Sequence, residues 1–427
     1  MNLYLGFDFG TSGVRTVLID DSAALQHLLS YSWQLTTIAQ SNLATSWKAA
    51  LWHLIEQIPQ KLRSEIRAIA IDATSSTVLL CDEVGEPVAE PLIYNDGRGL
   101  EVMETLKSIA PANHTVLSAT SSLTKLLWFI QNLKVKTQNY YFLHQADWLA
   151  FILHGQLGIS DYHNTLKLGY DVEKLCYPPW FKTLKLPVHL PKVVAPGTPI
   201  APLLPSIAQQ LGLAADCIVC AGTTDSIAAF LATGAKSPGE AATSLGSTLV
   251  LKLLSRTRIE DSKAGIYSHR LGNLWLVGGA SNTGGAVLRH FFKDNELESL
   301  SRKIDVNNES LLNYYPLLKP GERFPINDPY LAPCIEPKPI ESVDFLHGLL
   351  ESIARIEAQG YHLLQQLGAT PLTSVYSMGG GAKNSAWTTI RGRHLQVPML
   401  QPLHTSAAYG AALLARQGYN KKLTGLL

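Results

Sequence analysis

The amino-acid sequence predicts an α/β protein made of two similar halves. Apolar runs with the length of strands alternate with longer helical patterns along all 427 residues. Each half opens with two short strands joined by a small polar turn, around residues 9–13 in the first half and 244–248 in the second. Hydrophobic residues make up 46% of the chain and charged residues 16%, which indicates large buried cores and excludes a disordered protein.

The first half is expected to begin with a β-hairpin, because Gly10 and Gly13 bound the turn between two apolar runs. Apolar residues at helical spacing then predict a helix over residues 44–62. Six prolines within residues 187–205 predict irregular structure there. The other elements expected in this half are strands over 66–71 and 78–81 and helices over 123–133 and 147–153.

The second half repeats the strand-turn-strand opening, over residues 242–245 and 248–253. We place the boundary between residues 228 and 242, and assign residues 1–230 to an N-terminal domain and 231–427 to a C-terminal domain. The other elements expected around and after the boundary are strands over 216–220, 374–376 and 397–400 and helices over 225–235, 343–366, 382–394 and 405–415.

Charge and cysteine content exclude several classes of protein. The 35 basic and 34 acidic side chains leave a net charge of +1, so no overall field attracts nucleic acid or an anionic membrane. Five cysteines do not make a disulfide framework, and the CxxC pair Cys217 and Cys220 lies in an apolar run that reads as a buried strand. No signal peptide and no apolar run long enough to span a bilayer are visible. We expect a soluble cytoplasmic protein, monomeric or homodimeric, and leave open an organellar location of a mature form.

The first turn has the chemistry of a phosphate-binding loop. Gly10 lets the backbone approach an anion closely, and Thr11 and Ser12 add hydroxyl donors. Arg15 adds a fixed positive charge, and Asp8 is placed to hold a hydrated divalent cation. Alone, the same residues also fit an ordinary hairpin.

The second turn, with Gly246, Ser247 and Thr248, repeats this chemistry. Two such turns facing each other across a cleft would hold a polyphosphate from both sides. The segment Gly379-Gly380-Gly381 lies between a predicted strand and helix, where bare backbone leaves room for a flat ring or a sugar. Asn384 offers a donor and an acceptor beside it, and Trp387 an aromatic wall.

The segment Gly222-Thr223-Thr224-Asp225-Ser226 joins an apolar strand to an apolar helix. A carboxylate at a helix N-terminus stays ionised and can accept a hydroxyl proton during phosphoryl transfer. The alternative is a plain helix cap, since Thr and Asp both suit that position.

Taken together and in this order, these motifs resemble the FGGY carbohydrate kinases. The motifs are DxGTxxxR at 8–15, GTTD at 222–225, SLGST at 244–248 and GGGAKNSAW at 379–387, with further similarity at YNDGR (94–98), KLLW (125–128) and SNTGG (281–285). The resemblance implies a two-lobe actin-like (ribonuclease H-like) ATPase fold with a central cleft. The short chain is most similar to the compact pentulose-kinase-like branch of cyanobacteria and plants, which includes ribulose and xylulose kinases.

The resemblance also implies roles for individual residues. Asp225 matches the catalytic base, and Asp8 matches the acid that organises Mg²⁺, usually through water. The residues that match the ATP-binding segments are Gly10, Thr11, Ser12, Arg15, Gly246, Ser247, Thr248, Gly380, Gly381, Asn384 and Trp387. ATP and Mg²⁺ are therefore the expected cofactors.

The sugar site is where the chain departs from the family pattern. Many xylulose kinases carry a Met-His pair after the strand that ends here at Asp72, whereas this chain has Thr74-Ser75-Ser76-Thr77. Ser75, Ser76 and Ser226 are therefore candidate sugar contacts together with Asp8 and Asp225, although the serines also suit a turn. Asp96 either faces the sugar or pairs with Arg98. The missing pair favours D-ribulose over D-xylulose as the substrate.

Two functions of different classes remain open from the sequence. One is an ATP-dependent kinase that phosphorylates the terminal hydroxyl of a ketopentose. The other is a nucleotide-binding regulatory protein on the same fold with little sugar kinase activity. Asp225 favours the kinase, because a nucleotide switch does not need a carboxylate at that position.

Overall fold

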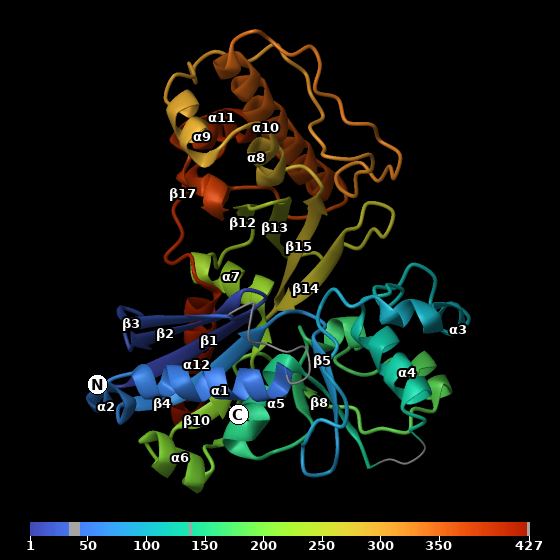
Figure 1. Cartoon of the computed structure of the whole chain (residues 1–427), viewed down its shortest axis with the longest axis vertical. Coiled ribbons are helices and arrows are strands. Elements are labelled where there is room, and N and C mark those ends of the chain that lie inside the picture. Colours follow the sequence, from blue (N-terminus) through green and yellow to red (C-terminus); the bar gives the residue numbers. More distant parts are fainter. Residues whose placement is uncertain (34–42, 136–138, 425–427) are drawn as a thin grey trace. The chain divides into compact units, whose positions relative to one another are not determined.

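The computed structural model describes residues 1–33, 43–135 and 139–424, which form mixed α/β structure in two compact units. Unit 1 comprises Met1–Ala232 and Ser406–Leu427, and unit 2 comprises Thr233–Thr405 (Figure 1). The predicted C-terminal domain of residues 231–427 thus differs from unit 2 at its end, because the C-terminal segment belongs to unit 1. Its helix α12 (Ala407–Thr424), red in Figure 1, packs against the first strand of unit 1 through small residues.

Unit 1 is built on a seven-stranded mixed sheet in the order β3-β2-β1-β4-β10-β9, with β11 beside β4. The predicted hairpin is confirmed, and its register places Asp8 opposite Arg15. β4 runs parallel to β1, and β10 runs parallel to β4. The strands are β1 (Leu3–Gly10), β2 (Gly13–Asp20), β3 (Leu25–Ser32), β4 (Ile66–Ala73), β9 (Pro199–Pro202), β10 (Ile218–Cys220) and β11 (Thr223–Thr224).

The two faces of this sheet have separate cores. Phe7 and Ile69 pack with α1 (Leu43–Gln57) and α5 (Gln145–His154) on one face. Tyr4 and Ala70 pack with α7 (Asp225–Thr233) and α12 on the other. Because side chains alternate along a strand, the even-numbered residues Asp8 and Asp72 point toward the α7 and α12 face. Cys217 and Cys220 contribute to the two different cores, which agrees with their interpretation as packing residues in a strand.

The rest of unit 1 is a layer of short elements around the antiparallel pair of β5 and β6. α1 is shorter than predicted, because Pro59 interrupts the helix before α2. Residues 187–205, expected to be irregular, contain two short strands. The elements are α2 (Gln60–Arg63), β5 (Val78–Cys81), η1 (Arg98–Val102), α3 (Met103–Lys107), α4 (Ser122–Asn132), β6 (Tyr141–His144), β7 (Ile159–Asp161), η2 (Thr165–Leu168), η3 (Pro179–Leu184), β8 (Lys192–Val194) and α6 (Pro205–Leu211).

Unit 2 has a six-stranded sheet in the order β14-β15-β13-β12-β16-β17. β12 and β13 form an antiparallel hairpin, β15 extends it, and β16 and β17 add parallel strands on the other side. This is the arrangement of β1, β2, β3, β4 and β10 in unit 1, so the predicted duplication is confirmed at the level of topology. The strands are β12 (Glu240–Leu245), β13 (Leu249–Ser255), β14 (Tyr267–Leu271), β15 (Leu274–Ser281), β16 (Ser374–Met378) and β17 (Met399–Leu400).

The helices of unit 2 cover its sheet with a core around α10. The helix predicted over 382–394 is divided in two, because Asn384 caps the second part by accepting a hydrogen bond from the N–H of Trp387. The helices are α8 (Gly285–Phe291), α9 (Asp294–Ser301), α10 (Ser342–Gln366), η4 (Gly380–Lys383) and α11 (Ser385–Leu395). None of the helices in the described ranges combines the length and apolar character that crossing a membrane requires.

Candidate functional site

Three carboxyl groups gather at one end of the sheet of unit 1. Asp8 lies near the end of β1, and Asp72 lies directly opposite it on β4. Thr223 of β11 also pairs with Asp72, and Asp225 follows two residues later at the start of α7. Parallel strands and the strand-to-helix turn thus bring together residues that are far apart in the sequence.

Their proximity shows in the electrostatics of the site. Burial and the charge of Asp225 raise the pKa of Asp8 to about 6, against the opposing effect of Arg15. Burial and the charges of Asp8 and Asp225 hold the pKa of Asp72 well above its usual range. Three carboxylates this close repel one another, so the site favours a proton or a cation among them.

Asp72 is a site residue that the sequence analysis missed. It is completely buried, and among the described residues no N–H or hydroxyl group donates a hydrogen bond to its oxygens. A hydrogen bond to Asp8 forms only when one of the two carboxyls carries a proton. A single Asp at the end of a strand has no local signal for such a role, since the role depends on the register with Asp8.

Further buried polar atoms near this end of the sheet lack protein partners. Within the described ranges, the hydroxyls of Ser76 and Thr224 make no hydrogen bond, although these side chains are only 1% exposed. Unsatisfied buried polar groups are rare in folded proteins and mark places where a ligand supplies the partner. Carboxylate and hydroxyl oxygens are also the groups that Mg²⁺ prefers, so the residues present fit a bound magnesium ion.

Asp225 opens α7 and is half-buried. The N–H of the exposed Ser226 donates a hydrogen bond of 2.6 Å to its Oδ1 atom. The carboxylate therefore lies at the positive end of the helix, which stabilises its charged form. This position is compatible with helix capping and with proton transfer at the same time.

The first glycine loop, residues 10–13, joins β1 to β2. It lies beside Asp8, Asp72 and Asp225, which together form the acidic cluster. Thr11 and Ser12 are exposed, and Gly10 is half-buried. Arg15 is exposed and forms an ion pair with Asp8, since its Nη1 atom lies 3.6 Å from Oδ2 of Asp8. Its charge thus reaches the acidic cluster directly.

The residues predicted to contact the sugar differ in their exposure and in their hydrogen-bond partners. Ser75 is half-buried, whereas Ser76 is buried with a positive φ of 64°. Asp96 accepts hydrogen bonds from Nε and Nη2 of Arg98, so the structure has the pairing alternative for this residue. Burial raises the pKa of Asp96, but the bonds from Arg98 outweigh burial and leave the pKa below its usual value.

The second glycine loop belongs to unit 2 and is fixed by α8. The N–H groups of Gly285 and Ala286 donate to the carbonyls of Gly246 and Ser247. Ser247 is exposed and Thr248 is half-buried, and the residues beside the loop, Leu245, Gly285 and Arg289, line a cavity. Arg289, one turn further along α8, donates a hydrogen bond of 3.2 Å to the Ser247 hydroxyl. This arginine could not be predicted as a site residue, because nothing in its local sequence relates it to the loop.

A cavity of about 660 Å³ lies in unit 2 and is lined by four of the residues predicted to bind ATP, namely Gly380, Gly381, Asn384 and Trp387. Gly380 has nothing within 4 Å of the position of an added Cβ, and a Cβ on Gly381 would lie 2.5 Å from the Trp387 ring. Asn384 lines the cavity, but its amide caps α11 and donates to Ser301 Oγ at 2.8 Å. Asn384 therefore shapes the wall, and the glycines leave the open space. The other lining residues include Leu245, Leu288, Arg289 and Arg302.

A smaller cavity of about 190 Å³ lies in unit 1 among Gly10, Trp33, Trp47, Thr74 and Tyr94. Trp47 belongs to the core of the α1 face, opposite the face toward which Asp8 and Asp72 point. Thr74 and Thr77 of the turn after β4 and Tyr94 before Asp96 line this cavity, so it lies between two of the segments predicted to contact the sugar.

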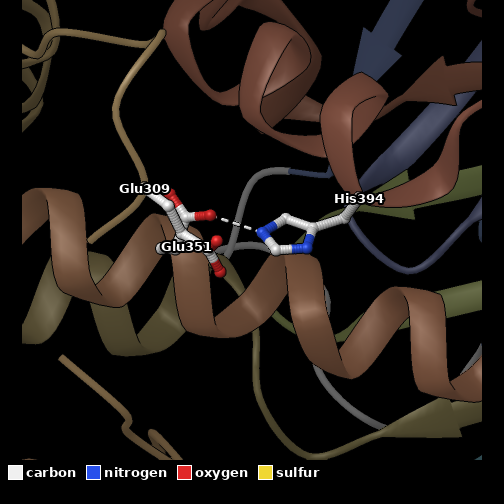
Figure 2. Close-up of side chains that lie close together, drawn as sticks. All are labelled: Glu309, Glu351 and His394. Atoms are coloured by element: carbon white, nitrogen blue, oxygen red, sulfur yellow. Dashed lines mark hydrogen bonds and ion pairs between the residues drawn. The ribbon is translucent and has the colours of Figure 1, made fainter. Parts of the chain in front are cut away.

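In the part of the chain that the structure describes, one group of side chains has the spacing of metal ligands, namely Glu309, Glu351 and His394 of unit 2 (Figure 2). Glu351 already accepts hydrogen bonds from Arg393 at 2.6 and 2.7 Å and from His394. Arg355 lies 3.5 Å from Glu309. Both carboxylates thus already pair with positively charged or donor side chains, and the cluster is an ion-pair network that joins α10 to α11.

Comparisons with known proteins show the family and the fold of this chain. The sequence matches the N-terminal domain of the FGGY family of carbohydrate kinases over residues 3–232 and the C-terminal domain over residues 241–418. It is 22% identical to xylulose kinase of Staphylococcus xylosus, over 98% of this chain and 91% of the relative. It is 23% identical to gluconokinase of Bacillus subtilis (strain 168), over 96% of this chain and 86% of the relative.

Solved structures with the same fold include ligand-bound xylulose kinase from Lactobacillus acidophilus, with a TM-score of 0.82 at 18% identity over 100% of this chain and 90% of that one. Glycerol kinase of Plasmodium falciparum with ADP gives a TM-score of 0.85 at 16% identity over 99% and 90% of the two chains. These similarities confirm the predicted two-domain actin-like ATPase fold. With both domains matched, the chain belongs to the FGGY family of carbohydrate kinases.

Proposed function

We propose that this carbohydrate kinase transfers the γ-phosphate of ATP to the C5 hydroxyl of a ketopentose, with D-ribulose as the preferred substrate and D-ribulose 5-phosphate as the product. The observation that carries this proposal is the acidic cluster of Asp8, Asp72 and Asp225, which lies next to buried hydroxyls without protein partners. Buried carboxyl groups that share one place repel one another, so a purely structural role would leave the cost of their burial uncompensated.

In this reaction Asp225 is the catalytic base. Its carboxylate accepts the proton of the sugar hydroxyl as the oxygen attacks the γ-phosphorus. The helix N-terminus keeps the carboxylate charged before the proton arrives. Ser75 is half-buried, and Thr74 and Thr77 line the smaller cavity of unit 1, so these hydroxyl side chains are available to the sugar.

Asp8 and Asp72 are the residues that would hold magnesium. Burial and the charge of Asp225 raise the pKa of Asp8, and this crowding of negative charge favours a cation between the carboxyl groups. A bound Mg²⁺ would neutralise charge on the transferring phosphate.

The nucleotide is assigned to unit 2. Its cavity of about 660 Å³ is large enough for an adenosine, and the loop of Gly246, Ser247 and Thr248 lies at its edge. The glycine segment at 380–381 supplies open space for the base, and Trp387 supplies an apolar wall.

D-Ribulose is preferred over D-xylulose because small hydroxyl side chains replace the Met-His pair of many xylulose kinases. D-Xylulose remains the second candidate, because relatives of this chain are named xylulose kinase. The two sugars differ only in configuration at C3. A site that reads this hydroxyl by hydrogen bonds discriminates strongly, since a misplaced hydroxyl leaves buried groups unpaired.

Side-by-side kinetics on D-ribulose, D-xylulose and gluconate test the proposal. We expect the highest kcat/KM with D-ribulose, and phosphate at C5 of the product. An equal or higher kcat/KM with D-xylulose would overturn the substrate preference and keep the kinase. ADP release at one rate with and without every sugar would instead favour a nucleotide-binding regulatory protein.

A further inference from the structure

Lys125 is a buried cation in unit 1 that the proposed reaction does not use. It lies on α4, and its side chain is completely buried. Its Nζ atom donates hydrogen bonds to the carbonyls of Ser76 at 2.7 Å, Ile93 at 2.6 Å and Tyr94 at 3.3 Å. Three carbonyl oxygens thus match the three donors of one ammonium group.

Burying this ammonium group away from water costs free energy. The burial of Lys125 therefore calls for a structural or functional explanation. Burial lowers the pKa of Lys125 to about 7, and the charge of Asp96 opposes the shift. The partners that the structure gives the ammonium are main-chain carbonyls, which offset desolvation less well than a carboxylate does. An apolar residue would fill the same space at lower cost, unless the two segments must be held in one geometry.

The segments that Lys125 joins are the ones predicted to contact the sugar. Ser76 lies in the turn after β4 with a φ of 64°, a conformation that non-glycine residues adopt at a cost. In the same turn, the hydroxyls of Thr74 and Thr77 are 2.5 Å apart. The other two carbonyls belong to residues that directly precede the Asn95-Asp96 segment. One side chain therefore fixes two segments that are distant from each other and from α4 in sequence.

We propose that Lys125 is a positioning residue of the sugar site, which holds the turn 74–77 against the segment 93–96 so that Thr74, Thr77 and Tyr94 keep their places along the smaller cavity of unit 1. The proposal rests on the proposed function. It follows that the loss of Lys125 weakens the binding of the sugar and leaves the nucleotide site of unit 2 intact. Since the side chain does not touch the reacting atoms, turnover at saturating sugar should fall much less than the affinity for sugar.

The test is the variant Lys125→Met, which keeps the length of the side chain and removes the donors. With D-ribulose as the sugar, we expect KM to rise by about 10- to 100-fold, because small displacements of positioning groups have effects of this size. The Kd of ADP, measured by calorimetry, should stay within a factor of about two of the wild-type value. Lys125→Arg keeps a positive donor in the same place, and we expect a smaller rise in KM.

Two control variants separate positioning from general destabilisation. Leu126→Ala removes a completely buried side chain from the adjacent position of α4 without touching the carbonyls. Lys107→Met makes the same substitution at an exposed lysine of unit 1 that pairs with Glu104. We expect both controls to keep the wild-type KM for D-ribulose at a temperature at which they are folded.

The outcomes distinguish this proposal from the proposed function. An unchanged KM in folded Lys125→Met, or the same rise in KM in Leu126→Ala, would overturn the positioning role. If Lys125→Met does not fold, the same comparison is made with Lys125→Gln, which removes the charge, and a wild-type KM in that folded variant would overturn the positioning role. Wild-type protein that neither binds nor phosphorylates D-ribulose or D-xylulose would instead contradict the proposed function.

Discussion

Asp225 is the residue on which the proposed chemistry depends most. Replacing it with Asn keeps the size of the side chain and removes the base, so phosphoryl transfer should fall by about 10²–10⁴-fold. Nucleotide binding should survive, because the cavity that we assign to adenosine lies in unit 2 and Asp225 lies in unit 1. Turnover and the Kd of ADP are measured on the same preparation. Full kcat in the Asn variant would remove Asp225 from the role of base.

The position of Arg289 predicts a contact with the phosphates of the nucleotide. Its guanidinium lies at the Ser247 hydroxyl of the second glycine loop, where it can bind phosphate oxygens in place of that hydroxyl. Arg289→Ala should weaken the binding of ATP by about tenfold and leave the binding of adenosine unchanged.

The matched control for Arg289 is Arg302→Ala. Arg302 lines the same cavity and is paired with Glu298, so its loss should affect ATP less. Calorimetry with ATP and with adenosine gives both affinities. Equal losses for the two ligands in Arg289→Ala would show that this residue shapes the cavity without contacting phosphate.

The raised pKa of Asp161 predicts that the stability of the protein depends on pH. Burial, followed by the charge of Asp147, raises its pKa to about 7, whereas an aspartate in an unfolded chain titrates near pH ~3.9. Between these values the folded state binds more protons than the unfolded state. The contribution of Asp161 to the free energy of unfolding is therefore fully present below pH ~3.9 and is lost as the pH rises through about 7.

Asp161→Asn removes this titration. Relative to wild type, the free energy of unfolding of the variant should increase by on the order of a few kcal/mol between about pH 5 and about pH 8, as measured in urea. Asp216→Asn changes an exposed carboxylate of the same unit and serves as the control. A difference between variant and wild type that does not change with pH would contradict the assignment.

Among the elements, α12 shows how closely the helices of unit 1 approach each other and the sheet. A Cβ on Gly410 would lie 1.9 Å from the carbonyl oxygen of Ala228 on α7. Gly410→Ala should therefore push α12 away from α7 and lower the free energy of unfolding by about 1–3 kcal/mol. Because α7 begins with Asp225, turnover should fall as well.

The control for Gly410 is Gly392→Ala in α11 of unit 2. There the added methyl group meets only the flexible end of Met399, 3.2 Å away. Alanine also favours a helix over glycine, so this variant should be at least as stable as wild type. The stabilities of the two variants are compared by thermal unfolding. Equal stabilities would contradict the close packing of α7 and α12.

Elements with a strong local pattern could be predicted from the sequence. The helix expected over 343–366 corresponds to α10 at Ser342–Gln366, because its apolar residues recur at helical spacing. The strands β8 and β9 could not be predicted, since their partners β7 and β10 are distant in sequence and prolines suggested a loop. The end of α12 was placed too early, because its buried face consists of small residues that give little periodic signal.

The same distinction applies to the site. The glycine loops and the GTTD segment carry their chemistry in adjacent residues, so Asp8, Asp225 and the loop residues could be proposed from the sequence. Asp72 acquires its role from the register of β1 and β4. Lys125 acquires its role from carbonyls that come from two other segments. Such residues become visible only when the fold brings the segments together.

At the scale of the whole molecule, each unit contributes one glycine loop, residues 10–13 in unit 1 and 246–248 in unit 2. A nucleotide held by unit 2 can phosphorylate a sugar held by unit 1 only when the two units approach each other. Closure also excludes water and suppresses wasteful hydrolysis. Small-angle scattering should therefore give a smaller radius of gyration with D-ribulose and a non-hydrolysable ATP analogue than without ligands. An identical profile would argue against closure.

The central claim is that the γ-phosphate of ATP goes to a sugar. Phosphorus NMR of the reaction of the wild-type protein with ATP, Mg²⁺ and D-ribulose tests this most directly, because it resolves the products. We expect ADP and D-ribulose 5-phosphate to appear in equal amounts, with little inorganic phosphate and little ADP when the sugar is omitted. ADP and inorganic phosphate formed at the same rate with and without D-ribulose, D-xylulose or gluconate would contradict the account.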